Sequence, residues 1–275
     1  MILGKPAQKI WHGPVFFIVG CSRSGTTWVR NIYNSHPAVL VGEESYFFDE
    51  VVPPIRRVYA DKEGGPTGLH RYTTPNGLAR GIELFFRRLV WERAQKKSEA
   101  IWFGEKTPAH VHRIADILEV LPDARFVHVV RDVRDVVASM LDAARSWSPN
   151  PEATAVTTAD TWRRAVTAGL QAEERWSDRF LRVRYEDLAE DGVATIRRLF
   201  DFLEIHLDNQ QAGEIRDATR FERYTGGRRP GDPGGEGQFY RKGIVGGWRK
   251  SLSQADQKIA LRAAGGLHRS LGYTE

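Results

Sequence analysis

The chain has 275 residues, of which 41% are hydrophobic and 27% are charged, and it carries a formal net charge of +5. This composition supports a sizeable core and excludes an intrinsically disordered or fibrous chain. The length fits one large domain, and because no shift in composition marks a second unit, we expect a single domain over residues 1–275.

The single cysteine, Cys21, excludes an internal disulfide and any cysteine-built metal site. The first residues lack the apolar core of a signal peptide, and the longest early apolar run, Val15 to Val19, is too short to cross a bilayer. These features predict a soluble, cytoplasmic protein that uses no metal and no membrane.

The run Val15 to Val19 is bounded by Pro14 and Gly20, which is typical of a strand buried on both faces of a parallel sheet. A polar turn follows, and Thr26 to Ser35 is predicted to be a helix. The same alternation continues, with strands expected at 101–103, 126–130 and 180–183 and helices at 75–89, 111–121, 133–145, 159–176 and 187–202. This order predicts an α/β fold with a doubly wound parallel sheet flanked by helices.

The turn from Gly20 to Trp28 joins the first predicted strand to the first helix. Such a turn aims backbone N–H groups and the positive end of a helix at one point, which suits a phosphate-like group. No lysine precedes Thr26 and Thr27, so the Walker A pattern for a Mg-nucleoside triphosphate is absent, and Arg23 supplies a forked cation instead. In the alternative interpretation, the Ser and Thr side chains only cap the helix.

Two later stretches also suit anions. Arg131 and Ser139 lie eight residues apart where a predicted strand ends, and ligands of open α/β sheets bind at that edge. Arg241 and Lys242 precede Gly243, which allows close backbone approach. The segment 226–237 before them has six glycines and two prolines, and we expect it to be a mobile loop. Together with the first turn, these stretches predict a ligand with more than one phosphate-like group.

In this order the three motifs resemble those of the sulfotransferase family, over residues 15 to about 250. The matching segments are CSRSGTTW from Cys21, the stretch Arg131 to Ser139, and R-K-G-x-x-G-x-W from Arg241. The resemblance implies a P-loop-like sulfotransferase fold. It also implies transfer of a sulfuryl group from 3'-phosphoadenosine 5'-phosphosulfate (PAPS), with adenosine 3',5'-bisphosphate (PAP) as the product.

The resemblance assigns the donor-binding residues to three groups. The group for the 5'-phosphosulfate comprises Arg23, Ser24, Gly25, Thr26 and Thr27. The group for the 3'-phosphate comprises Arg131, Ser139, Arg241, Lys242 and Gly243. The group for the adenine comprises Trp28, Tyr185 and Phe221.

An acceptor hydroxyl needs a nearby base to remove its proton. Cytosolic members of the family have a His after a Lys-Thr pair, but here Pro108 takes that place. The segment G-E-E-S that contains Glu44 resembles the G-E-E-T of tyrosylprotein sulfotransferases, and the following Y-F-F-D resembles the H-F-F-D of heparan sulfotransferases. This likeness implies that Glu44 is the base, with Glu105 and then His110 as alternatives.

The segment Glu105 to Pro108 resembles the E-K-T-P of carbohydrate sulfotransferases. It implies that Lys106, together with Arg23, stabilises the transition state. The acceptor is expected to be a hydroxyl of a small molecule, glycan or peptide, and the sequence does not identify it.

Two other functions compete with sulfuryl transfer. A P-loop kinase would need a lysine in the first turn and carboxylates placed for Mg. A module that binds polyanions or nucleic acid would spread its basic residues over a surface, whereas here they are concentrated in three motifs. We therefore expect no nucleic-acid partner.

Overall fold

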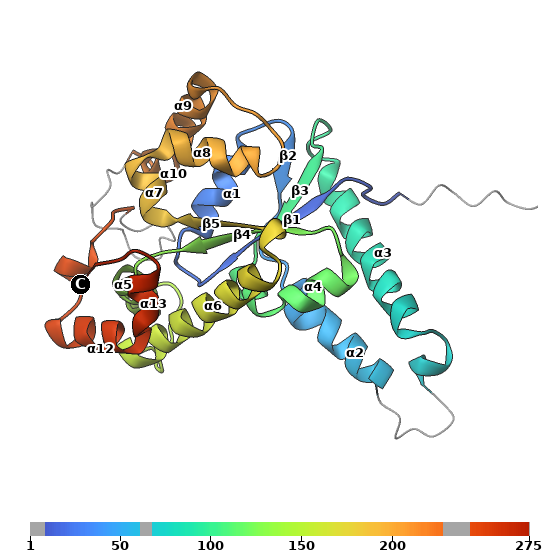
Figure 1. The fold of residues 1–275 in the computed structure, drawn as a ribbon, viewed down its shortest axis with the longest axis horizontal. Helices are drawn as coiled ribbons and strands as arrows, with labels where there is room; N and C mark the ends of the chain where they lie inside the picture. Colours follow the sequence, from blue (N-terminus) through green and yellow to red (C-terminus); the bar gives the residue numbers. More distant parts are fainter. Residues whose placement is uncertain (1–8, 61–67, 228–242, 275) are drawn as a thin grey trace, which may run out of the picture.

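The computed structural model describes residues 9–60, 68–227 and 243–274. Its centre is a five-stranded sheet with the order β2-β3-β1-β4-β5, in which every neighbouring pair is parallel (Figure 1). The strands are β1 (Val15–Gly20), β2 (Val39–Val41), β3 (Trp102–Glu105), β4 (Arg125–Val130) and β5 (Phe180–Arg184). The predicted α/β fold with a parallel sheet is confirmed.

Strand β1 occupies the middle of the sheet, and all six of its residues are buried. Phe17 pairs with Glu105 on one side and with Phe126 on the other. Because both faces of β1 are covered, its sequence is a continuous apolar run rather than an alternation. This burial fixes the turn that follows it at the centre of the sheet edge.

Thirteen α-helices are assigned in the described part of the chain. They are α1 (Thr26–Asn34), α2 (Val52–Ala60), α3 (Pro75–Ala94), α4 (Ile114–Val120), α5 (Val133–Arg145), α6 (Ala155–Arg175), α7 (Tyr185–Glu190), α8 (Gly192–Asp201), α9 (Asn209–Ala218), α10 (Phe221–Tyr224), α11 (Trp248–Ser251), α12 (Gln254–Ala264) and α13 (Gly266–Ser270). Among the described helices, none is long and apolar enough to cross a membrane.

The helices cover the sheet in two layers, as Figure 1 shows. Phe16 and Ile18 of β1 pack in one core with α1, α8 and α9. Phe17 and Val19 point the other way and pack in a second core with α3, α4, α5 and α6. Alternate residues of one strand therefore hold opposite layers together.

Capping side chains account for several helix starts. Thr74 accepts a hydrogen bond from the backbone N–H of Gly77 at 3.1 Å, as expected for a cap before Pro75. Helix α6 begins four residues earlier than predicted, because Thr154 and Thr157 form a capping box. The helix predicted at 187–202 is two helices, since the chain turns at Asp191, which caps α8.

Other differences from the sequence prediction follow from packing. The helix predicted at 111–121 begins as a 3-10 turn at Pro108–His112 and continues as α4. On α3, Phe85 and Leu89 are 47% and 46% exposed, although they fall on the predicted apolar face. Most of the predicted mobile loop at 226–237 lies outside the described residues.

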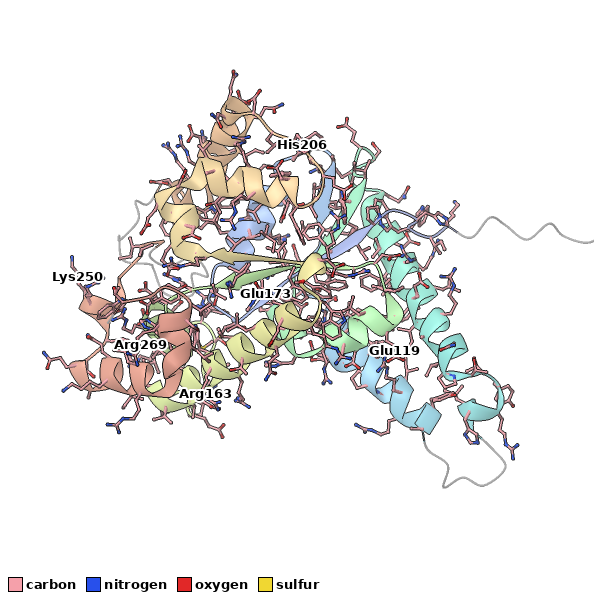
Figure 2. All side chains as sticks on the ribbon, in the orientation of Figure 1. Glu119, Arg163, Glu173, His206, Lys250 and Arg269 are labelled. Atoms are coloured by element: carbon pink, nitrogen blue, oxygen red, sulfur yellow. The ribbon has the colours of Figure 1, made fainter. Side chains whose placement is uncertain are left out.

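Many basic residues outside the three motifs lie at the surface. Arg163 and Arg164 of α6 are exposed and both contact Asp160, at 2.6 and 3.0 Å. In Figure 2, Arg163 lies on the outer side of α6, and Lys250 and Arg269 extend from the C-terminal helices. Such exposed pairs contribute little to stability, and they explain part of the positive charge without a nucleic-acid surface.

Candidate active site

A cavity of about 840 Å³ lies at the carboxyl end of the sheet. Residues that follow each of the five strands line it: Arg23, Glu44, Pro108, Arg131 and Tyr185. This is the edge at which open parallel sheets bind ligands. The three motifs singled out in the sequence, which are far apart along the chain, contribute to this one cavity.

The turn between β1 and α1 is built for close approach. Arg23 and Gly25 have positive φ angles of 71° and 99°. A Cβ on Gly25 would lie 2.5 Å from the ring of Tyr185, so only glycine fits there. No side chain caps α1, and the buried Ser24 hydroxyl has no hydrogen-bond partner among the described residues. The Ser and Thr side chains of this turn therefore do not cap α1.

Arg23 and Ser139, which were both assigned to the donor, are in contact. The Arg23 Nε atom donates to Ser139 Oγ at 3.0 Å, and its guanidinium lies 5.4 Å from the ring centroid of Trp147. In this conformation Arg23 reaches across to α5, towards the predicted 3'-phosphate group. The contact places the cation of the first turn beside the second motif.

Arg131 connects three of the predicted donor-binding segments. Its guanidinium lies 4.0 Å from the ring centroid of Tyr185. The same side chain donates to the backbone oxygens of Arg23 at 3.3 Å and Ile244 at 2.9 Å. Its Nε atom is buried and has no partner among the described residues. Arg131 is thus positioned at the centre of this end of the cavity.

Aromatic side chains line the same end. Trp28 packs edge-on against Tyr185, with ring centroids 5.3 Å apart, and its Nε1 atom has no hydrogen-bond partner within the described ranges. Phe221 lies against Gly243, where an added Cβ would be 2.5 Å from the Phe221 ring. Burial raises the pKa of Tyr185, so this phenol is neutral at physiological pH.

The structure thus brings most of the predicted donor-binding residues to one cavity. Ser24 is the exception among the described ones, because its buried hydroxyl does not line the cavity wall. Arg241 and Lys242 lie outside the described residues, so their assignment to the 3'-phosphate stays a prediction. Gly243, which follows them, lines the cavity.

Glu44 lies in the same cavity, between two donors. Its Oε1 atom is 2.5 Å from Lys106 Nζ, and its Oε2 atom accepts a hydrogen bond from the Tyr46 hydroxyl at 2.7 Å. Lys106 is buried, whereas Glu44 and Tyr46 line the cavity. The hydrogen bond to Glu44, helped by partial burial, raises the pKa of Tyr46 to about 12, so its phenol stays a donor. The sequence did not predict that Tyr46 donates a hydrogen bond to Glu44.

A buried hydrogen-bond network supports the segment that carries Glu44. Glu105 accepts from the Ser45 backbone N–H at 3.0 Å and from the Thr107 hydroxyl at 2.5 Å, and it contacts His110 Nδ1 at 3.0 Å. His110 Nε2 in turn accepts from the Phe48 backbone N–H at 3.3 Å. Burial raises the pKa of Glu105, but the contacts with His110, Thr107 and Ser45 outweigh it and lower the pKa overall.

Neither Glu105 nor His110 is among the cavity-lining residues that the structure describes. Both are buried and bonded within the network, away from the cavity, so they are placed to hold the Glu44 segment rather than to touch an acceptor. Phe47 and Phe48 are also buried, at 2% and 0% exposure, in the core beside Phe86. They therefore do not line the cavity.

Comparison with known proteins identifies the family. The model of the sulfotransferase family matches residues 14–209, which is more than half of the chain. The chain belongs to the sulfotransferase family. The match includes the turn after β1, Glu44, Lys106, Arg131 and Tyr185, whereas Phe221 and Gly243 lie beyond it. Membership leaves the kinase and nucleic-acid-binding interpretations without support.

A curated relative of this sulfotransferase is the protein-tyrosine sulfotransferase 1 of Danio rerio, which is 26% identical over 199 residues, covering 70% of this chain and 53% of the relative. The protein-tyrosine sulfotransferase A of Caenorhabditis elegans is 25% identical over 205 residues, covering 72% of this chain and 51% of the relative. The chain spans about half the length of these curated relatives.

Solved sulfotransferase structures share the fold. The sulfotransferase domain of the Synechococcus PCC 7002 olefin synthase superimposes with a TM-score of 0.58 at 20% identity, covering 98% of each chain. A retinol dehydratase solved with retinol and PAP superimposes with a TM-score of 0.54 at 19% identity, covering 97% of this chain and 85% of the other. At this identity the likeness concerns the fold.

Proposed function

We propose that this sulfotransferase moves a sulfuryl group from PAPS to an acceptor hydroxyl, with Glu44 as the general base. The observation that carries the proposal is the single cavity that joins an anion-binding turn to a carboxylate–lysine pair. The retinol dehydratase of the same fold has been solved in a complex with PAP. The family of this chain supports the same donor.

The residues at one end of the cavity fit such a donor. The turn around Arg23 suits the 5'-phosphosulfate, because its amide groups and the start of α1 favour an anion. Arg131 and Ser139 suit the 3'-phosphate, and Trp28 and Phe221 offer faces for the adenine. When bound, PAPS supplies the sulfuryl group and leaves as PAP. The cations expected at Arg241 and Lys242 belong to the same proposal.

Glu44 and Lys106 carry the chemistry at the other end. Glu44 takes the proton of the acceptor hydroxyl. At the same time the hydroxyl oxygen of the acceptor bonds to sulfur, and the bond from sulfur to the 5'-phosphate oxygen breaks. Lys106, 2.5 Å from Glu44, supplies a positive charge for the oxygens that gain negative charge in this step. Arg23 supplies a second one at the donor. The proton ends on the carboxylate, and the negative charge that Glu44 loses appears on the 5'-phosphate oxygen of the departing PAP.

The acceptor is proposed only as a class: the hydroxyl of a small molecule, a glycan or a peptide. The curated relatives are named protein-tyrosine sulfotransferases, which supports a phenolic hydroxyl among the first acceptors to try. A cytoplasmic location is likewise part of the proposal, supported by the lone, buried Cys21.

Titration of the protein with PAP, with AMP and with Mg-ATP tests the donor. We expect PAP to bind without a metal and to raise the melting temperature, because a ligand that binds only the folded state stabilises it. Release of PAP from PAPS is then followed with 4-nitrophenol, a tyrosine peptide and simple sugars as acceptors. Stabilisation by Mg-ATP alone, with no response to PAP, would contradict the proposal.

A further inference from the structure

Two side chains hold the segment 243–248 against α5: Asp135, which belongs to this helix, and Arg131, which precedes it. Asp135 accepts hydrogen bonds from the backbone N–H groups of Gly246 at 2.7 Å and Trp248 at 2.9 Å. Arg131 donates to the backbone oxygen of Ile244 at 2.9 Å. The contacts join positions 111 and 113 residues apart, so the sequence gives no local signal of them.

The backbone of this segment is shaped for these bonds. Gly246 has a φ of 72°, which favours glycine and lets its N–H face the carboxylate. A Cβ on Gly247 would lie 3.7 Å from Asp135 Oδ1 of α5 and 3.0 Å from the Ile244 side chain of the same segment. The positive φ of Gly246 and the contact of Gly247 with Ile244 favour glycine at both positions.

Asp135 lines the end of the cavity that we assign to the donor, yet it carries a negative charge. A lone carboxylate there would repel a phosphate. Asp135 is 4% exposed, and its oxygens are occupied by two amide N–H groups with Arg131 3.9 Å away. Its bonds are thus directed at the protein segment and not at a ligand.

We propose that Asp135 is a positioning residue for recognition of the 3'-phosphate: it fixes the segment 243–248 on α5. This inference rests on the proposed function, since it concerns the donor of that reaction. Gly243 begins the segment and follows directly on Arg241 and Lys242, the cations assigned to the 3'-phosphate. Gly243, Ile244 and Gly247 of the segment line the cavity, so Asp135 and Arg131 hold this part of its wall in place.

The variant Asp135→Asn tests this role, because it removes the charge while keeping the shape. Its amide nitrogen would face a backbone N–H, so at least one of the two hydrogen bonds is lost. A hydrogen bond to a charged group contributes about 1.5–3 kcal/mol, which corresponds to about 10- to 100-fold in binding. We expect the dissociation constant for PAP to rise by that factor. The dissociation constant for AMP, which lacks the 3'-phosphate, should change by less than about threefold.

Calorimetric titration of the wild type and the variant with PAP and with AMP gives both constants. Glu152→Gln is the matched control, because Glu152 also lines the cavity, and the segment's bonds at Gly246 and Trp248 go to Asp135 and not to Glu152. If loss of negative charge alone mattered, both variants would bind PAP more tightly. We expect only Asp135→Asn to weaken PAP.

Two results would overturn the assignment: unchanged PAP affinity in Asp135→Asn, or equal losses for PAP and AMP. If the variant does not fold, Asp135→Glu keeps the charge and moves the carboxylate by one methylene group, and it should show a smaller loss in the same direction. A wild type that binds AMP as tightly as PAP would instead contradict the proposed function itself. The comparison of the two nucleotides therefore separates the two failures.

Discussion

The two ends of the cavity differ in how their polar groups are satisfied. At the donor end, Trp28 Nε1 and Arg131 Nε are buried and have no hydrogen-bond partner among the described residues. At the other end, which we call the catalytic end, Glu44 is bonded by both Lys106 and Tyr46. Buried polar groups are normally paired. The unpaired atoms of the donor end can therefore bond a ligand, whereas the Glu44 carboxylate is already bonded within the protein.

This difference indicates how binding and chemistry are divided. The donor end gains partners when a ligand enters, so substitutions there should act on affinity. The catalytic end is arranged in advance by the network of Glu105 and His110, so substitutions there should act on turnover. Arg23 belongs to both descriptions, because it lies in the donor turn and is also assigned to the reaction.

The sharpest test of this division is Glu44→Gln, which keeps the shape but cannot accept a proton. We expect kcat to fall by about 10²- to 10⁴-fold with the best acceptor of the panel, because general base catalysis contributes that much. The dissociation constant for PAP should not change. Steady-state kinetics and PAP titration measure the two quantities.

Glu43→Gln is the matched control for this test. Glu43 is the neighbouring residue, its side chain is 75% exposed, and it contacts Arg30 at 3.1 Å. Its variant should keep the wild-type kcat. A Glu44→Gln enzyme with normal turnover would show that Glu44 is not the base.

The variant Arg23→Ala tests the residue that spans both descriptions. We expect turnover at saturating PAPS to fall by about 10²- to 10³-fold, the usual cost of removing one charge-stabilising donor. The affinity for PAP should fall as well, because Arg23 also contacts Ser139. Near wild-type turnover at saturating PAPS would limit Arg23 to binding.

Tyr46→Phe tests whether the second donor to Glu44 matters. Removing the Tyr46 hydroxyl removes a hydrogen bond to the charged Glu44 carboxylate. We therefore expect kcat to fall by about tenfold while PAP affinity stays constant. Tyr72→Phe is the control, because Tyr72 is 87% exposed. A change in PAP affinity without a change in kcat would place Tyr46 at the donor end instead.

The smallest effect on function is expected at His128, whose ring nitrogens also lack partners in the described structure. His128 is fully buried on β4 against Gly169 and does not line the cavity, so its unpaired nitrogens reflect packing and no ligand. Burial, with a smaller contribution from Arg182, lowers its pKa to about 3. We expect His128→Leu to leave PAP affinity unchanged.

The same histidine should make stability depend on pH. Its pKa is lower in the folded state than the unfolded value of about 6.5, so the unfolded chain binds the proton and stability is lost as pH falls below about 6.5. Between pH 7 and 5 this loss amounts to about 2 kcal/mol. Urea unfolding at both pH values should show a loss smaller by that amount in His128→Leu, and equal losses in both proteins would contradict the pKa.

The sequence predicts the parts of the fold that depend on local patterns. Strands β1 and β4 are apolar runs between clear boundaries, and helix α5 has the predicted bounds because Asp132 caps it. Strand β2 has only three residues and lacks flanking signals, so it was not predicted. The helices after α8 were not predicted, because their positions depend on tertiary contacts with other elements.

The site shows the same limit. Arg23, Glu44 and Arg131 could be selected because each follows a strand and belongs to a recognisable motif. The roles of Tyr46 and Asp135 could not, because they rest on contacts with particular side chains or with amides more than 100 residues away. In the sequence, Asp135 is only a polar residue four positions after Arg131.

A crystal structure of the complex with PAP tests the central claim most directly. The account predicts the adenine between Trp28 and Phe221 and the 3'-phosphate at Arg131 and Ser139, so that the unpaired atoms of the donor end gain partners. The contact between Glu44 and Lys106 should remain as it is. PAP bound outside this cavity, or bound with the Glu44–Lys106 pair separated, would contradict the division between a donor end and a catalytic end.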